Sequence, residues 1–157
     1  MIGASTTKMA KSEPVQENCR RCLPRWCVGL VLIATGTGKA LDIPGFVPVL
    51  AAYELLPAWG IVLVAYTLPC IELATGFCLV ARIALPLAAW VAVGLHLMLL
   101  GVVLLTLWRG ITIANCGCFG VFLARPLNGQ TVVEDAVMLA LSLWVLRQIR
   151  CRNSTGG

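Results

Sequence analysis

Two cysteines separated by a single glycine, Cys116-Gly117-Cys118, are the residues of this sequence best suited to chemistry. Two thiols at this spacing can close only a small ring, and a disulfide in such a ring departs from relaxed geometry. Strained disulfides are easily reduced, so this pair could donate a disulfide to a partner dithiol. The same cysteines could instead form a static structural disulfide, stay inert or bind a soft metal ion; the sequence offers no second ligand pair nearby, which disfavours a metal.

A second pair, Cys19-Arg20-Arg21-Cys22, holds two cations between its cysteines. Cations lower the pKa of a thiol and raise its thiolate fraction, as an exchanging dithiol requires. The pair lies in a polar segment without the helix N-terminus that usually orients a redox C-x-x-C, and the cytosol keeps such thiols reduced. We therefore favour a basic anchor with incidental or lipidated cysteines, and retain Cys19 and Cys22 only as accessory thiols.

The other four cysteines are Cys27, Cys70, Cys78 and Cys151. A free cysteine in an apolar setting usually behaves as a small hydrophobe, which is the interpretation favoured here. Cys70 and Cys78 share a helix face about two turns apart, too far for a direct bond. A thiol relay across the bilayer through Cys78, Cys70 and Cys22 would therefore need large motions.

Glu72 and His96 are ionisable residues near the middle of two long apolar runs. A charged side chain at that depth costs at least about 2.5 to 3.5 kcal/mol on insertion scales, so both should face the interior of a helix bundle. At similar depth on antiparallel helices, they could pair or share a proton. The pair could be a structural hydrogen bond, or it could supply acid-base groups and head-group contacts for a quinone.

The composition excludes a soluble globular protein. Of the 157 residues, 59% are hydrophobic and 12% are charged, and the mean hydropathy is +0.90. An ordinary soluble domain is roughly 45 to 50% apolar and about 25% charged. The basic residues stand in small groups beside apolar runs, as in membrane topology signals, which argues against nucleic-acid binding. We expect an integral membrane protein in contact with lipid.

The apolar runs predict an all-α membrane protein, a bundle of four transmembrane helices. The expected helices cover residues 26–41, 58–80, 84–108 and 131–147. The first is short for a bilayer of about 30 Å, so Lys39 is expected to mark its outer end by snorkelling. We interpret it as an uncleaved span because no clear signal-peptide cleavage site follows it.

The remaining segments predict connections and tails. Residues 42–57 contain several prolines and should form a short interfacial helix between the first two spans. Residues 109–130 should form the loop that carries the C-x-C pair, and Thr131 with Glu134 could form a capping box for the last helix. Residues 1–25 are expected to be a flexible basic cytoplasmic tail, and residues 148–157 a short polar one.

The distribution of Lys and Arg predicts the sidedness. Nine basic residues fall in the two tails and beside the connection between the second and third spans, and three fall on the other side. Because cytoplasmic loops carry the excess of basic residues, both termini are expected in the cytoplasm. In a bacterial inner membrane, the C-x-C loop would then face the oxidising periplasm.

Several sequence runs, in order, resemble the MauE family of methylamine utilisation proteins, which are relatives of the DoxX/DoxD membrane proteins. They are TGTGKALDIPGF, AAYELLP, PCIELATGF, RGITIANCGCFG and VEDAVMLAL, within the stretch from about Trp26 to Leu146. The resemblance implies a four-helix inner-membrane protein that works beside a thioredoxin-like periplasmic partner, MauD, in maturing the disulfide-rich small subunit of methylamine dehydrogenase. It also implies that Cys116 and Cys118 are redox-active, and leaves the N-terminal segment with Cys19 and Cys22 unexplained.

Two functional hypotheses follow. In the first, the protein is a disulfide oxidoreductase or a related redox component, with Cys116 and Cys118 exchanging with a soluble dithiol. Electrons would pass to or from the membrane through a quinone, with Glu72 and His96 as contacts, or through thiols. In the second, the protein is a non-enzymatic scaffold or export factor for a maturation partner, and the C-x-C pair is a structural clip.

Overall fold

The computed structural model describes the backbone of residues 16–118, 120 and 125–154. Every regular element among these residues is a helix, which confirms the all-α class. The helices are α1 (Gln16–Leu41), α2 (Ile43–Ala51), α3 (Ala58–Ala81), α4 (Leu85–Trp108) and α5 (Gly129–Ser154). The predicted short helix between the first two long ones is present as α2, and the boundaries of α3 and α4 agree with expectation within a residue.

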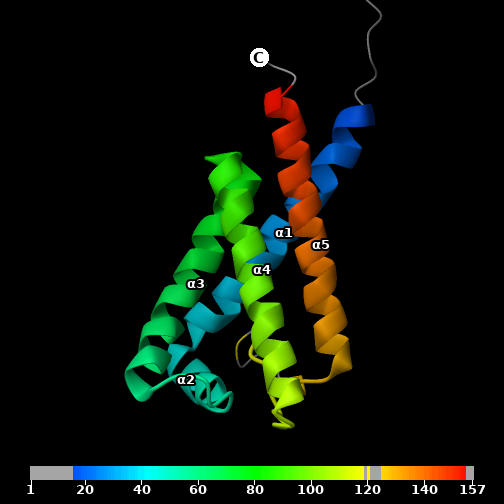
Figure 1. Cartoon of the computed structure of the whole chain (residues 1–157). Helices are drawn as coiled ribbons and strands as arrows, with labels where there is room; N and C mark the ends of the chain where they lie inside the picture. Colours follow the sequence, from blue (N-terminus) through cyan, green and yellow to red (C-terminus); the bar gives the residue numbers. More distant parts are fainter. Residues whose placement is uncertain (1–15, 119, 121–124, 155–157) are drawn as a thin grey trace, which may run out of the picture.

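Four long helices form the bundle, with α2 at one end (Figure 1). Helix α1 packs mainly against α3, and α4 packs mainly against α5, while contacts between α3 and α4 and between α1 and α5 close the bundle. The start of α1, the end of α5 and the α3–α4 connection lie at the same end of the molecule. The loop after α4 and helix α2 lie at the opposite end, which brings them together although they are far apart in the sequence.

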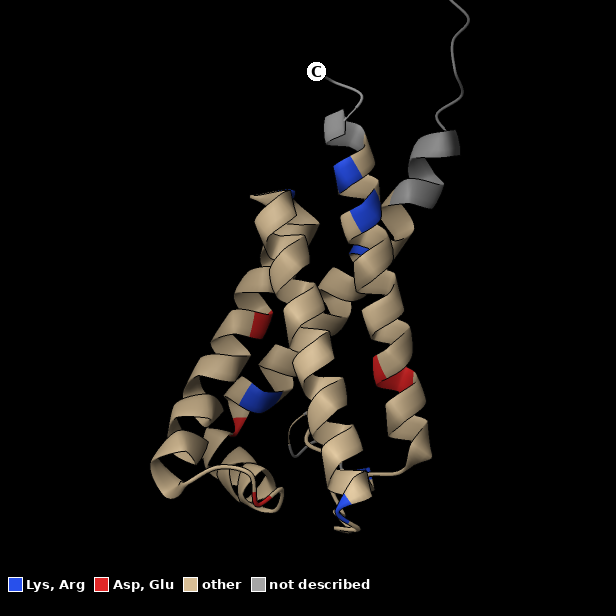
Figure 2. Cartoon of the chain, viewed as in Figure 1, with Lys and Arg blue, Asp and Glu red and all other residues tan. Residues whose placement is uncertain are grey.

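Two helices, α3 and α4, are long and apolar enough to cross a membrane. Helices α1 and α2 count as a third span only as a pair, and they are bent by 100° relative to each other. In the part of the chain that the structure describes, length and composition therefore support two spans, or three if the bent pair is one span, and not all four of the predicted ones. Charged residues lie mostly toward the two ends of the bundle and leave long uncharged stretches between them (Figure 2), as expected for a membrane protein.

The sharp bend between α1 and α2 has a local cause. The Asp42 carboxylate accepts a hydrogen bond from the Gly45 backbone N–H at 2.9 Å and so caps the start of α2. Pro44 lies in the first turn, where its missing N–H costs no helical hydrogen bond. The chain therefore restarts as a new helix instead of continuing along α1.

Helix α1 begins at Gln16, ten residues before the predicted start at Trp26. Part of the segment predicted to be a flexible tail is therefore helical, and residues 1–15 lie outside the described part. Arg25 is buried and donates hydrogen bonds to the backbone carbonyls of Leu79 and Val80. These carbonyls lie in the last turn of α3, where the C=O groups of a helix have no N–H partner within the same helix. The Arg25 guanidinium supplies the missing donors and so holds α1 against α3.

The two connections at the helix ends have different caps. Arg82 follows α3 in the left-handed conformation (φ 63°) and turns the chain into α4. The capping box predicted for Thr131 and Glu134 is wrong. Helix α5 begins two residues earlier, at Gly129, because the Asn128 side chain accepts hydrogen bonds from the N–H groups of Gln130 (2.9 Å) and Thr131 (3.4 Å).

Two glycines allow α1 and α3 to approach closely. A Cβ atom added at Gly76 would lie 2.7 Å from the carbonyl oxygen of Gly29, and one added at Gly29 would lie 2.8 Å from a methyl carbon of Val80. Contacts this short are sterically forbidden, so this crossing needs a residue without a side chain on both helices. Small residues at helix contacts are the usual way for membrane helices to gain close packing.

We expect Gly76→Ala to destabilise the bundle, because the added methyl group would push α1 away from α3. The cost should be about 1 to 3 kcal/mol of unfolding free energy, measured by denaturation in mixed detergent micelles. Gly94→Ala in α4 is the matched control, because a Cβ atom there meets nothing within 4 Å. Equal stability of the two variants would show that the α1–α3 crossing does not depend on this contact.

Candidate functional site

An ion pair between Lys39 and Glu72 lies inside the bundle. The Lys39 ammonium nitrogen is 2.8 Å from each carboxylate oxygen of Glu72, and the two side chains are only 3% and 1% exposed. The predictions that Lys39 snorkels at the outer end of its helix and that Glu72 pairs with His96 are therefore both wrong. Because an unpaired charge is costly in an apolar interior, the Lys39 cation of α1 and the Glu72 anion of α3 bind each other.

His96 makes contacts within α4 and with α5 instead. Its Nδ1 atom is 2.7 Å from the Ala92 carbonyl oxygen and 3.1 Å from the Ser142 hydroxyl oxygen. A carbonyl can only accept, so Nδ1 carries the proton in this arrangement. The Ser142 hydroxyl in turn donates to the Met138 carbonyl at 2.9 Å. His96 thus joins α4 to α5, a contact that the sequence did not predict.

The C-x-C pair lies in a loop whose shape depends on neighbouring backbone contacts. Asn115 accepts a hydrogen bond from the Gly117 N–H (3.0 Å) through its side-chain oxygen and donates to the Gly120 carbonyl (3.3 Å) through its amide nitrogen. The Cys116 N–H donates to the Arg125 carbonyl at 2.8 Å. Gly117 has a φ of +71°, a left-handed conformation that favours glycine.

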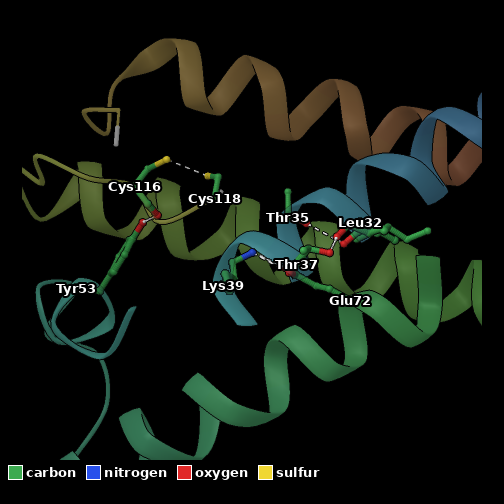
Figure 3. A network of polar contacts seen from close by, with 9 residues as sticks. Leu32, Thr35, Thr37, Lys39, Tyr53, Glu72, Cys116 and Cys118 are labelled. Carbon is green, nitrogen blue, oxygen red and sulfur yellow. Dashed lines mark hydrogen bonds and ion pairs between the residues drawn. The ribbon is translucent and has the colours of Figure 1, made fainter. Parts of the chain in front are cut away.

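This loop is pressed against α1 and α2. A Cβ atom at Gly117 would lie 2.7 Å from a methyl carbon of Val49, and one at Gly120 would lie 2.5 Å from the Gly38 carbonyl oxygen. The Tyr53 hydroxyl, which follows α2, donates to the Cys116 carbonyl at 2.6 Å (Figure 3). Burial raises the pKa of Tyr53, with smaller contributions from the charges of the two cysteines, and keeps it a neutral donor.

The two thiols of the loop are adjacent and unequal. Their sulfur atoms lie 3.0 Å apart and Figure 3 shows them pointing toward each other. The hydrogen bond from Cys118 lowers the pKa of Cys116 to about 6, although burial opposes this shift. The same hydrogen bond and burial raise the pKa of Cys118. Near neutral pH the arrangement therefore contains one thiolate and one thiol, which is the state that attacks disulfides.

The dithiol borders two cavities of different character. The larger is about 600 Å³ and has mostly apolar walls from the helices, together with Lys39, Glu72 and His96. The smaller is about 180 Å³ and is lined by polar residues of the loop and of the start of α5, including Arg125 and Glu134. These two form an ion pair at 3.0 Å and are more than two-fifths exposed, so the smaller cavity lies near the surface. Cys116 and Cys118 line both cavities.

The sequence reasoning missed two residues of the larger cavity, Lys39 and Asp135. Asp135 lines this cavity from α5, and its Oδ2 atom is buried without a hydrogen-bond partner among the described residues. The negative charge of Asp135 raises the pKa of Cys116 and of Cys118, and the positive charge of Lys39 lowers the pKa of Cys118. The available signal was a charged residue next to a long apolar run, which an outward-pointing helix end explained equally well.

The accessory thiol of Cys22 does not join this site. Cys22 accepts a hydrogen bond from the Arg82 guanidinium at 3.3 Å, at the end of the bundle opposite the C-x-C loop. The side chain of Cys19 lies outside the described part of the chain. Cys27 and Cys70 are exposed on the outside of the helices instead of being buried small hydrophobes.

Comparison with known proteins identifies the family. The model of the family described as methylamine utilisation protein MauE matches residues 21–148, which include both cavities and the C-x-C pair. The chain belongs to the MauE family. It is similar to the MauE proteins of Paracoccus denitrificans (31% identity) and Methylophilus methylotrophus (32% identity), each over 74% of this chain. The matched region spans 62% and 59% of those two relatives, and no solved structure matches.

In this MauE-family chain, we expect Lys39→Met to lower the unfolding free energy by about 3 to 5 kcal/mol, because it leaves the Glu72 carboxylate buried and unpaired. The double variant Lys39→Met with Glu72→Gln should recover most of the loss, since no buried charge remains. Denaturation in mixed detergent micelles measures the unfolding free energy of the single and of the double variant. A single variant as stable as the parent would contradict the buried pairing.

A second prediction concerns the unequal thiols of this MauE-family protein. Cys118→Ala removes the hydrogen-bond donor, so the pKa of Cys116 should rise from about 6 toward the ordinary value of about 8.5. At pH 7 its alkylation by iodoacetamide should slow about tenfold, as followed by mass spectrometry of the loop peptide. Cys70→Ser, which changes an exposed cysteine of α3, should leave the pH profile unaltered. An unchanged profile in Cys118→Ala would exclude the proposed asymmetry.

Proposed function

We propose that this protein is a membrane thiol-disulfide component that passes disulfide bonds to a soluble partner through Cys116 and Cys118. The observation that carries the proposal is the placement of the two sulfur atoms 3.0 Å apart, with the pKa of Cys116 lowered to about 6. A structural clip needs only a closed bond, whereas this pair also has the low pKa of an exchanging thiol. The smaller polar cavity beside it gives a second thiol an approach from the surface.

The exchange conserves atoms and electrons. A thiolate of the partner attacks one sulfur of the Cys116–Cys118 disulfide, and a mixed disulfide forms as the other cysteine leaves. The second partner thiolate then breaks the mixed disulfide. The partner dithiol is oxidised to a disulfide, and Cys116 and Cys118 are left as a dithiol. A leaving group of low pKa speeds the first step, and Cys116 suits that role.

Family membership supports a place in methylamine utilisation, because the two curated relatives carry that name. We propose a thioredoxin-like partner resembling MauD, and the small subunit of methylamine dehydrogenase as the final client. The excess of basic residues at the end of the bundle where α1 starts and α5 ends supports a bacterial inner membrane with cytoplasmic termini. The C-x-C loop, at the opposite end, would then face the periplasm.

The proposal predicts that a protein retaining only Cys116 and Cys118 is oxidised in intact cells. A membrane-impermeant maleimide should label it from outside only after reduction. Cys116→Ser should then trap a mixed disulfide through Cys118, the cysteine that stays bonded to the partner when Cys116 leaves, visible as a larger species that disappears on reduction.

The matched controls are the double variant Cys116→Ser with Cys118→Ser, which should trap nothing, and Cys27→Ser, which should behave as the parent. If the double variant still supports maturation of the client, the protein is a scaffold or export factor and the C-x-C pair is only a clip. If the thiols label without reduction or never label from outside, the exchange role or the sidedness is wrong.

A further inference from the structure

Exchange with a soluble partner does not account for the larger cavity beside the dithiol. This cavity of about 600 Å³ is lined by all five helices and the C-x-C loop, and aliphatic side chains such as Leu68, Leu99 and Val102 make up most of its wall. Small-molecule sites typically measure about 300 to 1,000 Å³ and combine apolar walls with a few polar groups. An apolar cavity between helices that include two membrane-spanning segments suits a molecule dissolved in the lipid.

The few polar groups of the cavity are suited to a ligand that changes from acceptor to donor. The ammonium group of Lys39 has three N–H bonds, and the two oxygens of Glu72 at 2.8 Å leave it a third donor. The buried Oδ2 atom of Asp135 lacks a hydrogen-bond partner among the described residues and can accept. A carbonyl oxygen would bind the donor, and a hydroxyl group would bind the acceptor.

The dithiol borders both cavities and so faces two chemical environments. Cys116 and Cys118 border the polar cavity, which a protein thiol can approach, and the apolar cavity, which such a thiol cannot enter without desolvation. After each exchange the dithiol must lose two electrons before it can act again. A lipid-soluble molecule that accepts both electrons at carbonyl groups is a quinone.

We infer that the cavity of about 600 Å³ binds a lipid-soluble quinone, with its head group between the dithiol and Lys39, and that this quinone reoxidises Cys116 and Cys118. The Cys118 S–H bond breaks, the Cys116 thiolate and the Cys118 sulfur form one S–S bond, and the second proton comes from water. The two electrons and two protons convert the two carbonyl groups of the quinone into the two hydroxyl groups of the quinol. The reoxidation step rests on the proposed exchange function, whereas quinone binding does not.

Binding is tested with the full chain in lipid nanodiscs, by titrating decylubiquinone and following the quenching of tryptophan fluorescence. The parent should show saturable binding. Val64→Phe places a larger side chain in the cavity and should weaken binding at least tenfold. Val62→Phe makes the same change on the exposed face of the same helix, where Val62 is 49% exposed, and should bind as the parent does. Absence of saturable binding in the parent, or equal affinities of the two variants, overturns the inference.

A second pair of variants guards against misfolding of the first. Val102→Phe narrows the cavity from α4, and Leu104→Phe changes an exposed residue of the same helix as its control. Thermal unfolding in the same nanodiscs selects the folded variants before titration. Weaker binding in Val102→Phe alone supports the cavity as the site, and parent-like binding in both variants contradicts it.

The electron step is tested separately, so that its failure can be told from failure of the exchange. Reduced protein mixed anaerobically with decylubiquinone should form one quinol for each Cys116–Cys118 disulfide, measured by absorbance and by thiol labelling. The double variant Cys116→Ser with Cys118→Ser should form no quinol at a decylubiquinone concentration that saturates its binding. Mixed-disulfide trapping without quinone binding would overturn this inference alone, and quinone binding without trapping would overturn only the exchange function.

Discussion

The buried pairing of Lys39 with Glu72 is the constraint on which the arrangement of the site depends. Neither charge is tolerable alone in the apolar interior, so the last turn of α1 must lie against the middle of α3. Gly38, next to Lys39 in the chain, then presents its carbonyl to Gly120 of the C-x-C loop. The ion pair therefore fixes both the end of α1 and the surface against which the thiol loop packs.

The loop itself is held from three directions, and this explains how two flexible glycines can carry an ordered pair of thiols. Asn115 binds the loop backbone on both sides of the cysteines, Tyr53 binds the Cys116 carbonyl, and α2 fills the space beside Gly117. The bend of 100° between α1 and α2 places Tyr53 and the α2 side chains there. With the backbone fixed, the two sulfur atoms share one hydrogen bond unequally, and the pKa of Cys116 falls while that of Cys118 rises.

The sequence predicted the elements well and their contacts poorly. Long apolar runs identify α3 and α4 almost to the residue, because lipid requires every backbone polar group to be bonded within the helix. The ends set by side-chain caps were harder to predict. Polar residues at Gln16 and beyond suit a helix as well as a tail, so α1 starts before the predicted residue, and Asn128 replaces Thr131 as the cap of α5. The predicted pairing of Glu72 with His96 used depth alone, and depth does not say which helix faces which.

The sequence by itself determined that the chain is helical and apolar, that it carries a closely spaced pair of cysteines in a polar loop, and that this pair occurs among the motifs of the MauE family. These are properties of local composition and order along the chain. Only the tertiary structure decided that Lys39 is the partner of Glu72, that Asp135 borders the same cavity and that the dithiol borders both an apolar and a polar cavity. Such contacts depend on helix rotation and crossing, which are set by the close approach of Gly29 to Gly76 and by burial of the ion pair.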